Sequence, residues 1–542
     1  MRLTSVSKSL SYMEDTYVDP HTPKETTLHL YARTLIIKNA EFAMIALKMT
    51  IAWHHKHFKH DPINRYDLFV TSSRQPLASS EHQHLHLKEE YVLSNPETCN
   101  DLYYMQMLAT IFGTFLQNYY KQVSINSAIV EYLTTLFLEE TFGYAEIRIN
   151  IIKLIRLDPK KSLDLQRLHL LHSSIGHEAF MRDTCEFLTS GKSMPRTLEI
   201  CPDQMENDDR DTHVHLWQTW QYIFTSCIQS QLEMAAKHGL IEMPVYLIEM
   251  ITAVLKNPDI PDGVKAESLR LPDKSYIASK CSKINVELFS EIYDEFELFL
   301  ANCLHEEFFQ VFETLSGHDI PGFTPKASGT RKLQHLCLHT MVKANKPEYI
   351  EICCRVFDNS SCMQNKQNAL EVLRTNKYHD SKRVQDTALE KVDHWLTSLC
   401  GFYELSRQYI LDDSSPAAEK IDCIKSFAMN DPLAQLCLFA ILEVFTNEAF
   451  DLFHDRSGKG YQLIADIIIM LNNRLDVNQA CALLNKFSNW TKFDYHRKQL
   501  ALKQMERLIN HKPMYGQLLD QVAVLINQGR VAAAPLRAAY SL

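Results

Sequence analysis

The longest coherent pattern in this sequence is helical. From Trp217 to Leu542, apolar residues recur at the spacing of packed helices, interrupted by short breaks such as Asn257-Pro258-Asp259. The 542-residue chain contains only 14 glycines and 19 prolines, which leaves few turns and favours long helices over sheet. Successive antiparallel helix pairs stack into superhelices. We therefore predict a mainly α protein in which residues 206–542 form a solenoid-like helical domain.

The first part of the chain mixes strand and helix patterns. Three segments read as strands because they alternate or carry strand-forming residues: Thr26–Ala32, Tyr66–Thr71 and His84–Leu93. Apolar spacing over 40–55, 102–115 and 127–140 predicts helices. A polar connector with prolines and an acidic run follows over 193–213. We therefore predict an α/β domain over residues 1–205.

Composition narrows the class of protein. With 46% hydrophobic and 23% charged residues the chain is typical of a packed protein, and its net charge of −10 argues against nucleic-acid binding. No apolar run is long enough to span a membrane, and the start lacks the apolar core of a signal peptide. We therefore expect a cytoplasmic protein with its 14 cysteines reduced and mostly buried, without nucleic-acid or membrane partners.

Two groups of residues in the helical region carry a family resemblance. One is the turn Glu267-Ser-Leu-Arg-Leu-Pro-Asp-Lys-Ser-Tyr276. The other is a series near the carboxyl end: Phe453-His454, Gly460-Tyr461, Leu471-Asn472, Val477-Asn478-Gln479-Ala480, Trp490, Phe493-Asp494 and Arg497-Lys498-Gln499. In this order they resemble the closing segment of bacterial-type aminopeptidase N, a gluzincin of peptidase family M1.

The same family is matched more weakly in the first domain, at Ala46-Leu-Lys48, Tyr91-Val-Leu93 and His172-Ser-Ser-Ile-Gly176. The resemblance implies a remnant thermolysin-like domain followed by an α-superhelical domain. No stretch resembles the family's amino-terminal β-sandwich or its small second β-sandwich. We therefore interpret the chain as a truncated and degenerate homologue.

The resemblance also says where the zinc chemistry would be. The family's H-E-x-x-H helix holds two zinc ligands and a general base, and those three positions fall on Gly113, Thr114 and Gln117. The third ligand, a glutamate, falls on Leu136, with Glu131 and Glu139 out of step, and the oxyanion-stabilising tyrosine falls on Lys161. None of these residues can replace its counterpart, so we expect no catalytic residues, no metal ligands and no zinc cofactor.

The family motif that binds the substrate's amino terminus would fall on Leu77-Ala-Ser-Ser-Glu81. Its glutamate position is Ser80, and a one-residue slip would restore a carboxylate at Glu81. A solvated loop glutamate is the simpler interpretation. The residues that bind substrate therefore remain unknown from the sequence.

Several histidines could still suggest a metal site. His177-Glu178 and His305-Glu306 begin like H-E-x-x-H but continue into apolar residues, so we interpret both as structural. A helix end carries His54, His55, His57 and His60, which we interpret as exposed. If His82, His84 and His86 lie in a strand, they share one face and could bind a transition metal, although a solvated strand edge explains them as well.

The sequence thus favours a catalytically inactive aminopeptidase N-like protein that binds peptides or a protein partner. The alternative is a residual zinc aminopeptidase using a rearranged histidine set. A third interpretation is a decaying paralogue without a selected role, against which the intact amphipathic patterning argues. The sequence names neither a partner nor an oligomeric state.

Overall fold

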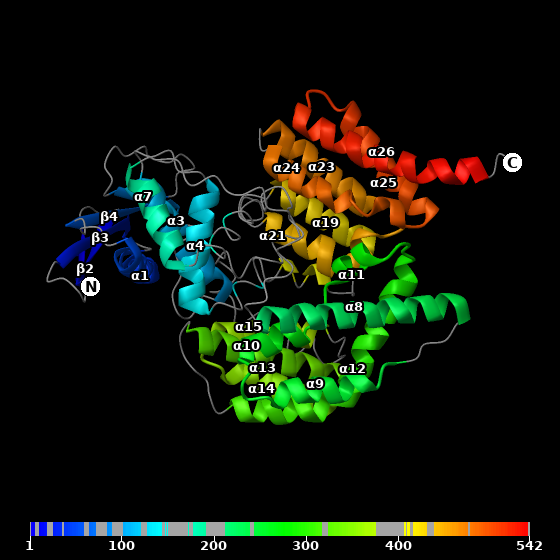
Figure 1. Ribbon diagram of the computed structural model, residues 1–542, viewed down its shortest axis with the longest axis horizontal. Coiled ribbons are helices and arrows are strands. Elements are labelled where there is room, and N and C mark those ends of the chain that lie inside the picture. Colours follow the sequence, from blue (N-terminus) through cyan, green and yellow to red (C-terminus); the bar gives the residue numbers. More distant parts are fainter. Residues whose placement is uncertain are drawn as a thin grey trace.

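The computed structural model describes residues 2–5, 10–18, 25–34, 37–58, 64–71, 84–88, 101–120, 127–143, 147, 149, 168, 172, 177–190, 212–238, 243–316, 324–375, 406–407, 409–411, 416–430, 438–474 and 477–539. Figure 1 shows a small sheet with a few helices at the amino-terminal side and two stacks of helices beyond it. The predicted mainly α fold is confirmed.

The sheet has five described strands: β1 (Arg2–Ser5), β2 (Leu10–Val18), β3 (Glu25–Arg33), β4 (Arg65–Thr71) and β5 (His84–Lys88). They lie in sequence order, the first three antiparallel and the last three parallel. The predicted strands at 26–32 and 66–71 are confirmed. β1 and β2 were not predicted, because in β2 buried and exposed positions do not follow apolar alternation: Ser11 is buried whereas Val18 is exposed.

Helix α1 (Glu41–Phe58) connects the parallel strands β3 and β4, as parallel pairing requires. It packs on α3 (Asp101–Tyr119), which in turn packs on α4 (Ser127–Phe142), and α7 (His177–Ser190) contacts α1. Aromatic rings join α1, α3 and α4. The ring centroids of Phe112 on α3 and Phe137 on α4 stack 4.4 Å apart, and Trp53 on α1 meets Phe112 edge-on at 5.1 Å. The helices predicted over 40–55, 102–115 and 127–140 are therefore confirmed.

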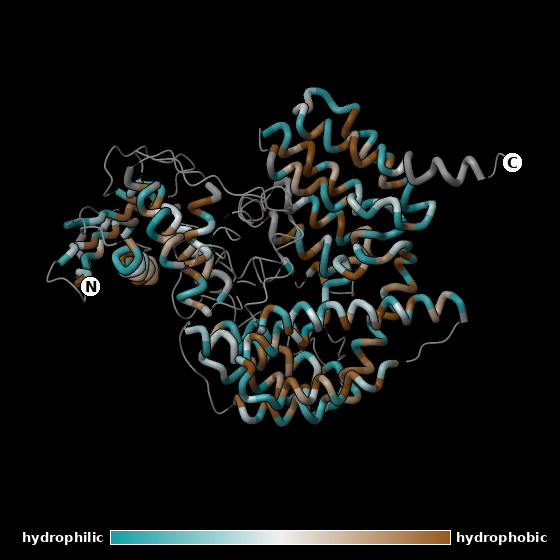
Figure 2. Tube along the Cα trace, viewed as in Figure 1, coloured by the Kyte–Doolittle hydropathy of each residue, from teal (hydrophilic) through white to brown (hydrophobic). Residues whose placement is uncertain are grey.

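The first helical stack contains α8 (Thr212–His238), α9 (Tyr246–Lys256), α10 (Asp262–Leu269), α11 (Lys274–Lys280), α12 (Val286–Ser316), α13 (Pro325–Lys343), α14 (Pro347–Asn359) and α15 (Met363–Thr375). Its core is built on phenylalanines of α12, such as Phe289 and Phe296, against leucines of α13. Figure 2 shows the hydrophobic positions of these helices turned toward one another. The sequence break at 257–259 separates α9 from α10, as predicted.

The second stack contains α19 (Ala417–Asn430), α21 (Leu438–Glu443), a π-helical segment η3 (Val444–Glu448), α22 (Phe450–Phe453), α23 (Lys459–Asn473), α24 (Val477–Leu484), the short 3-10 turns η4 (Asn485–Phe487) and η5 (Trp490–Lys492), α25 (Tyr495–Asn510) and α26 (Gly516–Ala539). Its core is separate from that of the first stack and centres on α23, where Ile464 and Ile467 are fully buried. Both stacks therefore carry a hydrophobic core of their own.

The carboxyl-terminal residues that carry the family resemblance pack against one another. The imidazole of His454 lies between Tyr461, whose hydroxyl is 2.9 Å from Nδ1, and Phe493, whose ring is 4.2 Å away. Arg497 donates from Nε to the carbonyl of His454 at 2.6 Å, and Asp494 caps α25 by accepting from the Arg497 amide at 3.0 Å. These family positions are therefore structural.

One buried ion pair links the helical region to the amino-terminal region. Arg331 of α13, which is 3% exposed, donates two hydrogen bonds to Asp101 at the start of α3: from Nε at 3.1 Å and from Nη2 at 2.5 Å. The backbone amide of Asp101 also donates to Gln364 of α15 at 3.1 Å. The helix that would carry a zinc motif is thus anchored at its first residue.

The predicted domain boundary at 205/206 lies in a stretch outside the described residues, and α8 begins at Thr212, so that boundary stays a prediction. Ten cysteines are described, all free; five are buried, four half-buried and only Cys303 is exposed. Within the described segments, no helix is long and apolar enough to cross a membrane.

Candidate functional site

The expected metal-binding positions lie on α3. Gly113 faces α4: a Cβ at this position would lie 3.6 Å from Val130 Cγ1 and 3.8 Å from Thr134 Oγ1. Thr114 is half-buried and Gln117 is exposed. Gly113 therefore faces side chains of α4, and Gln117 lies at the surface.

The remaining family positions do not complete a site. Leu136, at the third-ligand position, is 3% exposed in the amino-terminal core. Nearby on α4, Glu131 is exposed and Glu139 is buried. Lys161 and the segment 77–81 lie outside the described residues, so what was predicted for them stays a prediction.

A zinc ion does not fit the residues present on α3 and α4. A catalytic zinc needs three protein ligands, and here glycine and leucine stand at two of the three positions. Among the described residues, no group of three or more His, Cys, Asp or Glu side chains could hold a metal ion.

The histidines at the end of α1 are packed, so the interpretation of an exposed helix end is wrong. His54 is 1% exposed, and its Nε2 lies 2.8 Å from the Tyr120 hydroxyl. His57 Nε2 lies 2.7 Å from Glu140 Oε1. The last turn of α1 is covered by the ends of α3 and α4, which is why these side chains have partners. His60 lies outside the described residues.

The strand histidines share one face, as the alternation predicts. His84 and His86 on β5 are half-buried, with ring centroids 5.4 and 5.2 Å from that of Phe69 on β4. His84 Nε2 also lies 3.5 Å from Asp67 Oδ2. His82 lies outside the described residues, and metal binding by this cluster stays a prediction.

The two near-matches to the zinc motif differ in how much of them is described. His305 lies on α12, and its Nδ1 is 2.9 Å from the Tyr349 hydroxyl of α14, so it joins two helices. Glu178 is exposed at the start of α7, whereas the side chain of His177 is outside the described part of the chain.

A cavity of about 910 Å³ lies where the two helical stacks meet. The turn between α10 and α11 forms part of its wall, together with α12, α13 and α15, and residues of α19, η3 and α22 line the other side. Seven lining residues are aspartate or glutamate and five are lysine or arginine. A volume of this size suits a small-molecule or short-peptide ligand.

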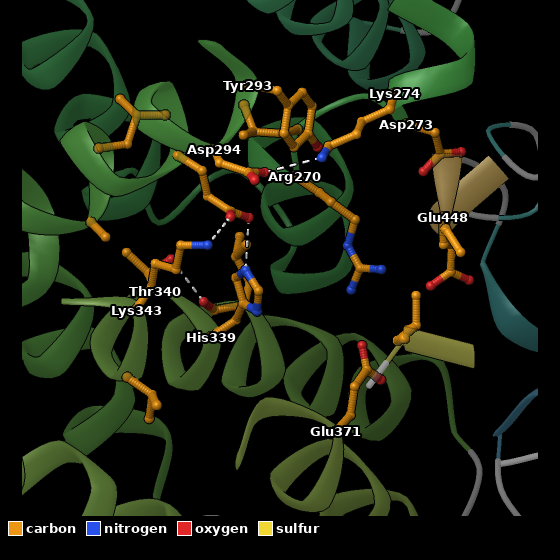
Figure 3. Close-up of a pocket in the computed structure, with 18 of the residues that line it drawn as sticks. Arg270, Asp273, Lys274, Tyr293, Asp294, His339, Thr340, Lys343, Glu371 and Glu448 are labelled. Atoms are coloured by element: carbon orange, nitrogen blue, oxygen red, sulfur yellow. Dashed lines mark hydrogen bonds and ion pairs between the residues drawn. The ribbon is translucent and has the colours of Figure 1, made fainter. Parts of the chain in front are cut away.

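Ion pairs organise most of the charges in the cavity. Lys274 Nζ lies 3.1 Å from Asp294 Oδ1 and 3.2 Å from Asp451 Oδ2. Lys343 Nζ lies 2.5 Å from Glu297 Oε2. Burial would raise the pKa of Glu297, but hydrogen bonds and charge from His339 and Lys343 outweigh it and lower the pKa to about 2. Figure 3 shows Lys274 beside Asp294, and Lys343 and His339 further along the cavity wall.

A second group of charges joins the two sides of the cavity. Arg407 Nη1 lies 2.7 Å from Glu371 Oε2, and its Nη2 lies 2.5 Å from Glu448 Oε2. His335 lies beside them, with Nε2 3.7 Å from Glu371 Oε1. Burial lowers the pKa of His335 to about 4, the nearby carboxylate notwithstanding, so this imidazole is neutral at pH 7.

The cavity was not identified from the sequence, which left the substrate-binding residues unknown. The sequence feature that comes closest to marking the cavity is the turn at 267–276, which carries part of the family resemblance. It places Arg270, Asp273 and Lys274 on the cavity wall. Three charged residues around a Leu-Pro turn could have marked this segment as a candidate. The pairing partners could not have been found, because they come from helices far along the chain.

Comparison with known proteins agrees with this architecture. The chain is 20% identical over 299 residues to aminopeptidase N of Haemophilus influenzae, covering 54% of this chain and 33% of the relative. It is 19% identical over 320 residues to aminopeptidase N of Escherichia coli, covering 56% and 35%. The chain thus spans about a third of the length of these curated relatives.

Solved structures extend the likeness to nearly the whole chain. A crystal structure of Legionella pneumophila aminopeptidase A in complex with aspartic acid superposes with a TM-score of 0.74, covering 96% of this chain and 77% of that chain at 17% identity. This likeness shows an aminopeptidase-like fold. The profile described as "Domain of unknown function (DUF3458_C) ARM repeats" matches residues 204–526, more than half of the sequence. The chain therefore belongs to this ARM-repeat family.

Proposed function

We propose that this chain is a catalytically inactive, aminopeptidase N-like protein that binds peptides or peptide segments of a protein partner in the cavity between its two helical stacks. The observation that carries the proposal is the cavity itself, about 910 Å³ and lined by charged side chains held in place by ion pairs. Such a lining offers both signs of charge to the termini and side chains of a peptide.

The residues at the expected metal positions support the inactive part of the proposal. Gly113 and Leu136 have no atom that can bind zinc, and the Gln117 amide is a poor ligand. Without a metal-activated water, a family M1-like reaction has no nucleophile. The cavity in the helical region does not depend on these residues, so binding can persist without catalysis.

Metal content and turnover test the inactive part. Purified full-length protein should contain substoichiometric zinc and should not hydrolyse alanyl or arginyl arylamides above a buffer blank. Stoichiometric zinc together with chelator-sensitive hydrolysis would instead establish the alternative, a residual metallopeptidase.

Peptide retention tests the binding part. A random tetrapeptide library incubated with the full chain should be retained on ultrafiltration, and mass spectrometry should read out the retained peptides. Leu452→Trp adds bulk at a half-buried cavity-lining residue and should reduce retention. Its thermal unfolding, followed by circular dichroism, shows whether the variant is folded. Equal retention by wild type and a folded Leu452→Trp variant would place binding elsewhere.

A further inference from the structure

Arg270 differs from three other cations of the cavity wall, and unlike the buried Lys420 it is exposed. Lys274, Lys343 and Arg407 each lie within an ion pair with carboxylates of the cavity wall. Arg270, in the turn after α10, is exposed to the cavity and makes no ion pair with any carboxylate of the residues that the structure describes. Figure 3 shows its guanidinium extending into the middle of the cavity, between the Lys274–Asp294 pair and Glu371.

Arg270 is nevertheless held in place. Its Nη2 lies 3.4 Å from His335 Nδ1, which can accept because this buried imidazole is neutral. The backbone is fixed as well: the Arg270 amide donates to the carbonyl of Ala266 at 3.2 Å, and its own carbonyl accepts from Gln221 Nε2 at 3.3 Å. A ligand would therefore meet a guanidinium that is already oriented, which lowers the entropy lost on binding.

The chemistry of this group selects the ligand. A guanidinium carries five N–H donors in a planar arrangement that matches a carboxylate in two parallel hydrogen bonds. His335 Nδ1 lies near one of its nitrogens, and among the described residues the Arg270 side chain makes no other hydrogen bond or ion pair. Its charge also helps to lower the pKa of Glu371. We propose that Arg270 binds a carboxylate of the ligand, either the carboxyl terminus of a peptide or an acidic side chain.

The surrounding charge argues against a free, multiply charged anion such as phosphate. The lining has more carboxylates than basic residues, and Asp273, three residues after Arg270, is exposed at the cavity. A dianion would be repelled by this field, whereas a carboxylate that belongs to a zwitterionic peptide brings a cationic group with it. The inference rests on the proposed peptide binding and adds that a carboxylate of the peptide is the group recognised.

The test compares two random tetrapeptide libraries that differ only at the carboxyl terminus, one with free acids and one with amides. We expect wild-type protein to retain the free-acid library at least tenfold more strongly. Arg270→Gln should lower free-acid retention to the level of the amide library and leave the amide library unchanged. Arg270→Lys, which keeps the charge but loses the two-point geometry, should fall between. Arg355→Gln, an exposed arginine of α14 outside the cavity, is the matched control.

The outcomes separate this inference from the proposed function. If neither library is retained, peptide binding fails and the inference fails with it. If both are retained equally and Arg270→Gln changes the retention of neither, peptide binding stands and the Arg270 assignment is overturned. Amides retained only when they contain aspartate or glutamate, and lost in Arg270→Gln, would assign the site to acidic side chains. Competition by inorganic phosphate at equal potency would contradict the selectivity for a carboxylate.

Discussion

Two regions of this protein correspond to family positions, and they hold different kinds of residue. On α3 and α4, the positions where the resemblance places a zinc site contain Gly113, which faces Val130 and Thr134, and Leu136, which is buried. Around α25, the family positions His454, Asp494 and Arg497 remain polar and are hydrogen-bonded to one another or to the backbone. The described residues at the expected zinc positions carry no histidine, whereas the described family positions around α25 form a polar network.

The difference has a physical basis. A metal ligand contributes to stability mainly when metal is bound, so replacing it with an apolar residue in a packed interface costs the fold little. A buried arginine with several acceptors cannot be removed so easily, because its partners would be left desolvated and unpaired. Folding therefore restricts the choice of residue more strongly at the family positions around α25 than at the expected zinc positions on α3 and α4.

Replacing Arg497 should give the largest loss of stability. Arg497 is 3% exposed and donates to Glu287, Asp494 and the carbonyl of His454. Arg497→Met leaves the buried carbonyl of His454 without its donor and breaks the pairs with the half-exposed carboxylates of Glu287 and Asp494, and we expect the free energy of unfolding to fall by about 3 kcal/mol. Urea denaturation measures this. Arg456→Gln removes a solvent-exposed partner of the same Glu287 and should have little effect; equal losses would refute a special role for the buried interlock.

The second prediction concerns the link between the two regions. Arg331→Met removes both hydrogen bonds to Asp101, and we expect a loss of about 2 kcal/mol. The loss is smaller than for Arg497, which bonds two carboxylates and also the buried carbonyl of His454. Hydrogen exchange should show α3 losing protection while α13 keeps it. Arg182→Met, which breaks an exposed pair with Asp183 on α7, should change stability by about 0.5 kcal/mol or less. Uniform loss of protection would mean that the pair is not a local anchor.

A third prediction tests whether the contact between α3 and α4 leaves room for a metal ligand at Gly113. Gly113→His places a Cβ 3.6 Å from Val130 and then forces an imidazole into the contact between α3 and α4, so we expect a loss of about 1–3 kcal/mol. Gln117→His, on the same helix but exposed, should be nearly neutral. The midpoint of thermal unfolding compares the two variants. A Gly113→His protein as stable as wild type would show that room for a ligand persists.

Helices and strands could be predicted from the sequence where one buried face gives the apolar residues a regular spacing. The helices containing Trp53, Phe112 and Phe137 follow from apolar spacing, because each buries one face in the same core. β2 could not be predicted, because only part of it is buried. The burial of His54 was also missed, since it depends on the Tyr120 hydroxyl, 66 residues away.

The same limit applies to the candidate site. The residues that stand at the zinc positions could be named from the sequence, because the resemblance fixes their spacing along α3 and α4. The absence of a zinc site stays a prediction. The cavity was not, because its pairs join distant helices: Lys274 is 177 residues from Asp451, and Arg407 is 36 residues from Glu371. No local pattern encodes such partners. Only the resemblance turn around Arg270 pointed toward the cavity.

The last prediction concerns how the stability of the protein depends on pH through His454. Histidine is the residue type expected, and not found, at the zinc positions of α3. Burial and the charge of Arg497 lower the pKa of His454 to about 3. An unfolded histidine takes up its proton near pH 6.5, so between pH 6.5 and about 3 the unfolded state binds more protons and stability falls as the pH falls. His454→Gln should make this slope shallower by up to about 1.4 kcal/mol per pH unit.

Urea denaturation between pH 5.0 and 7.5 measures that slope. Tyr461→Phe removes the hydroxyl 2.9 Å from Nδ1 but leaves the imidazole buried, so it should lower stability at every pH and keep the slope. Part of the slope should persist in His454→Gln, because burial also lowers the pKa of His335, to about 4. If His454→Gln left the dependence of stability on pH unchanged, His454 would have to be solvated. The hydrogen-bonded group around Arg497 would then be no more enclosed than the expected zinc positions on α3.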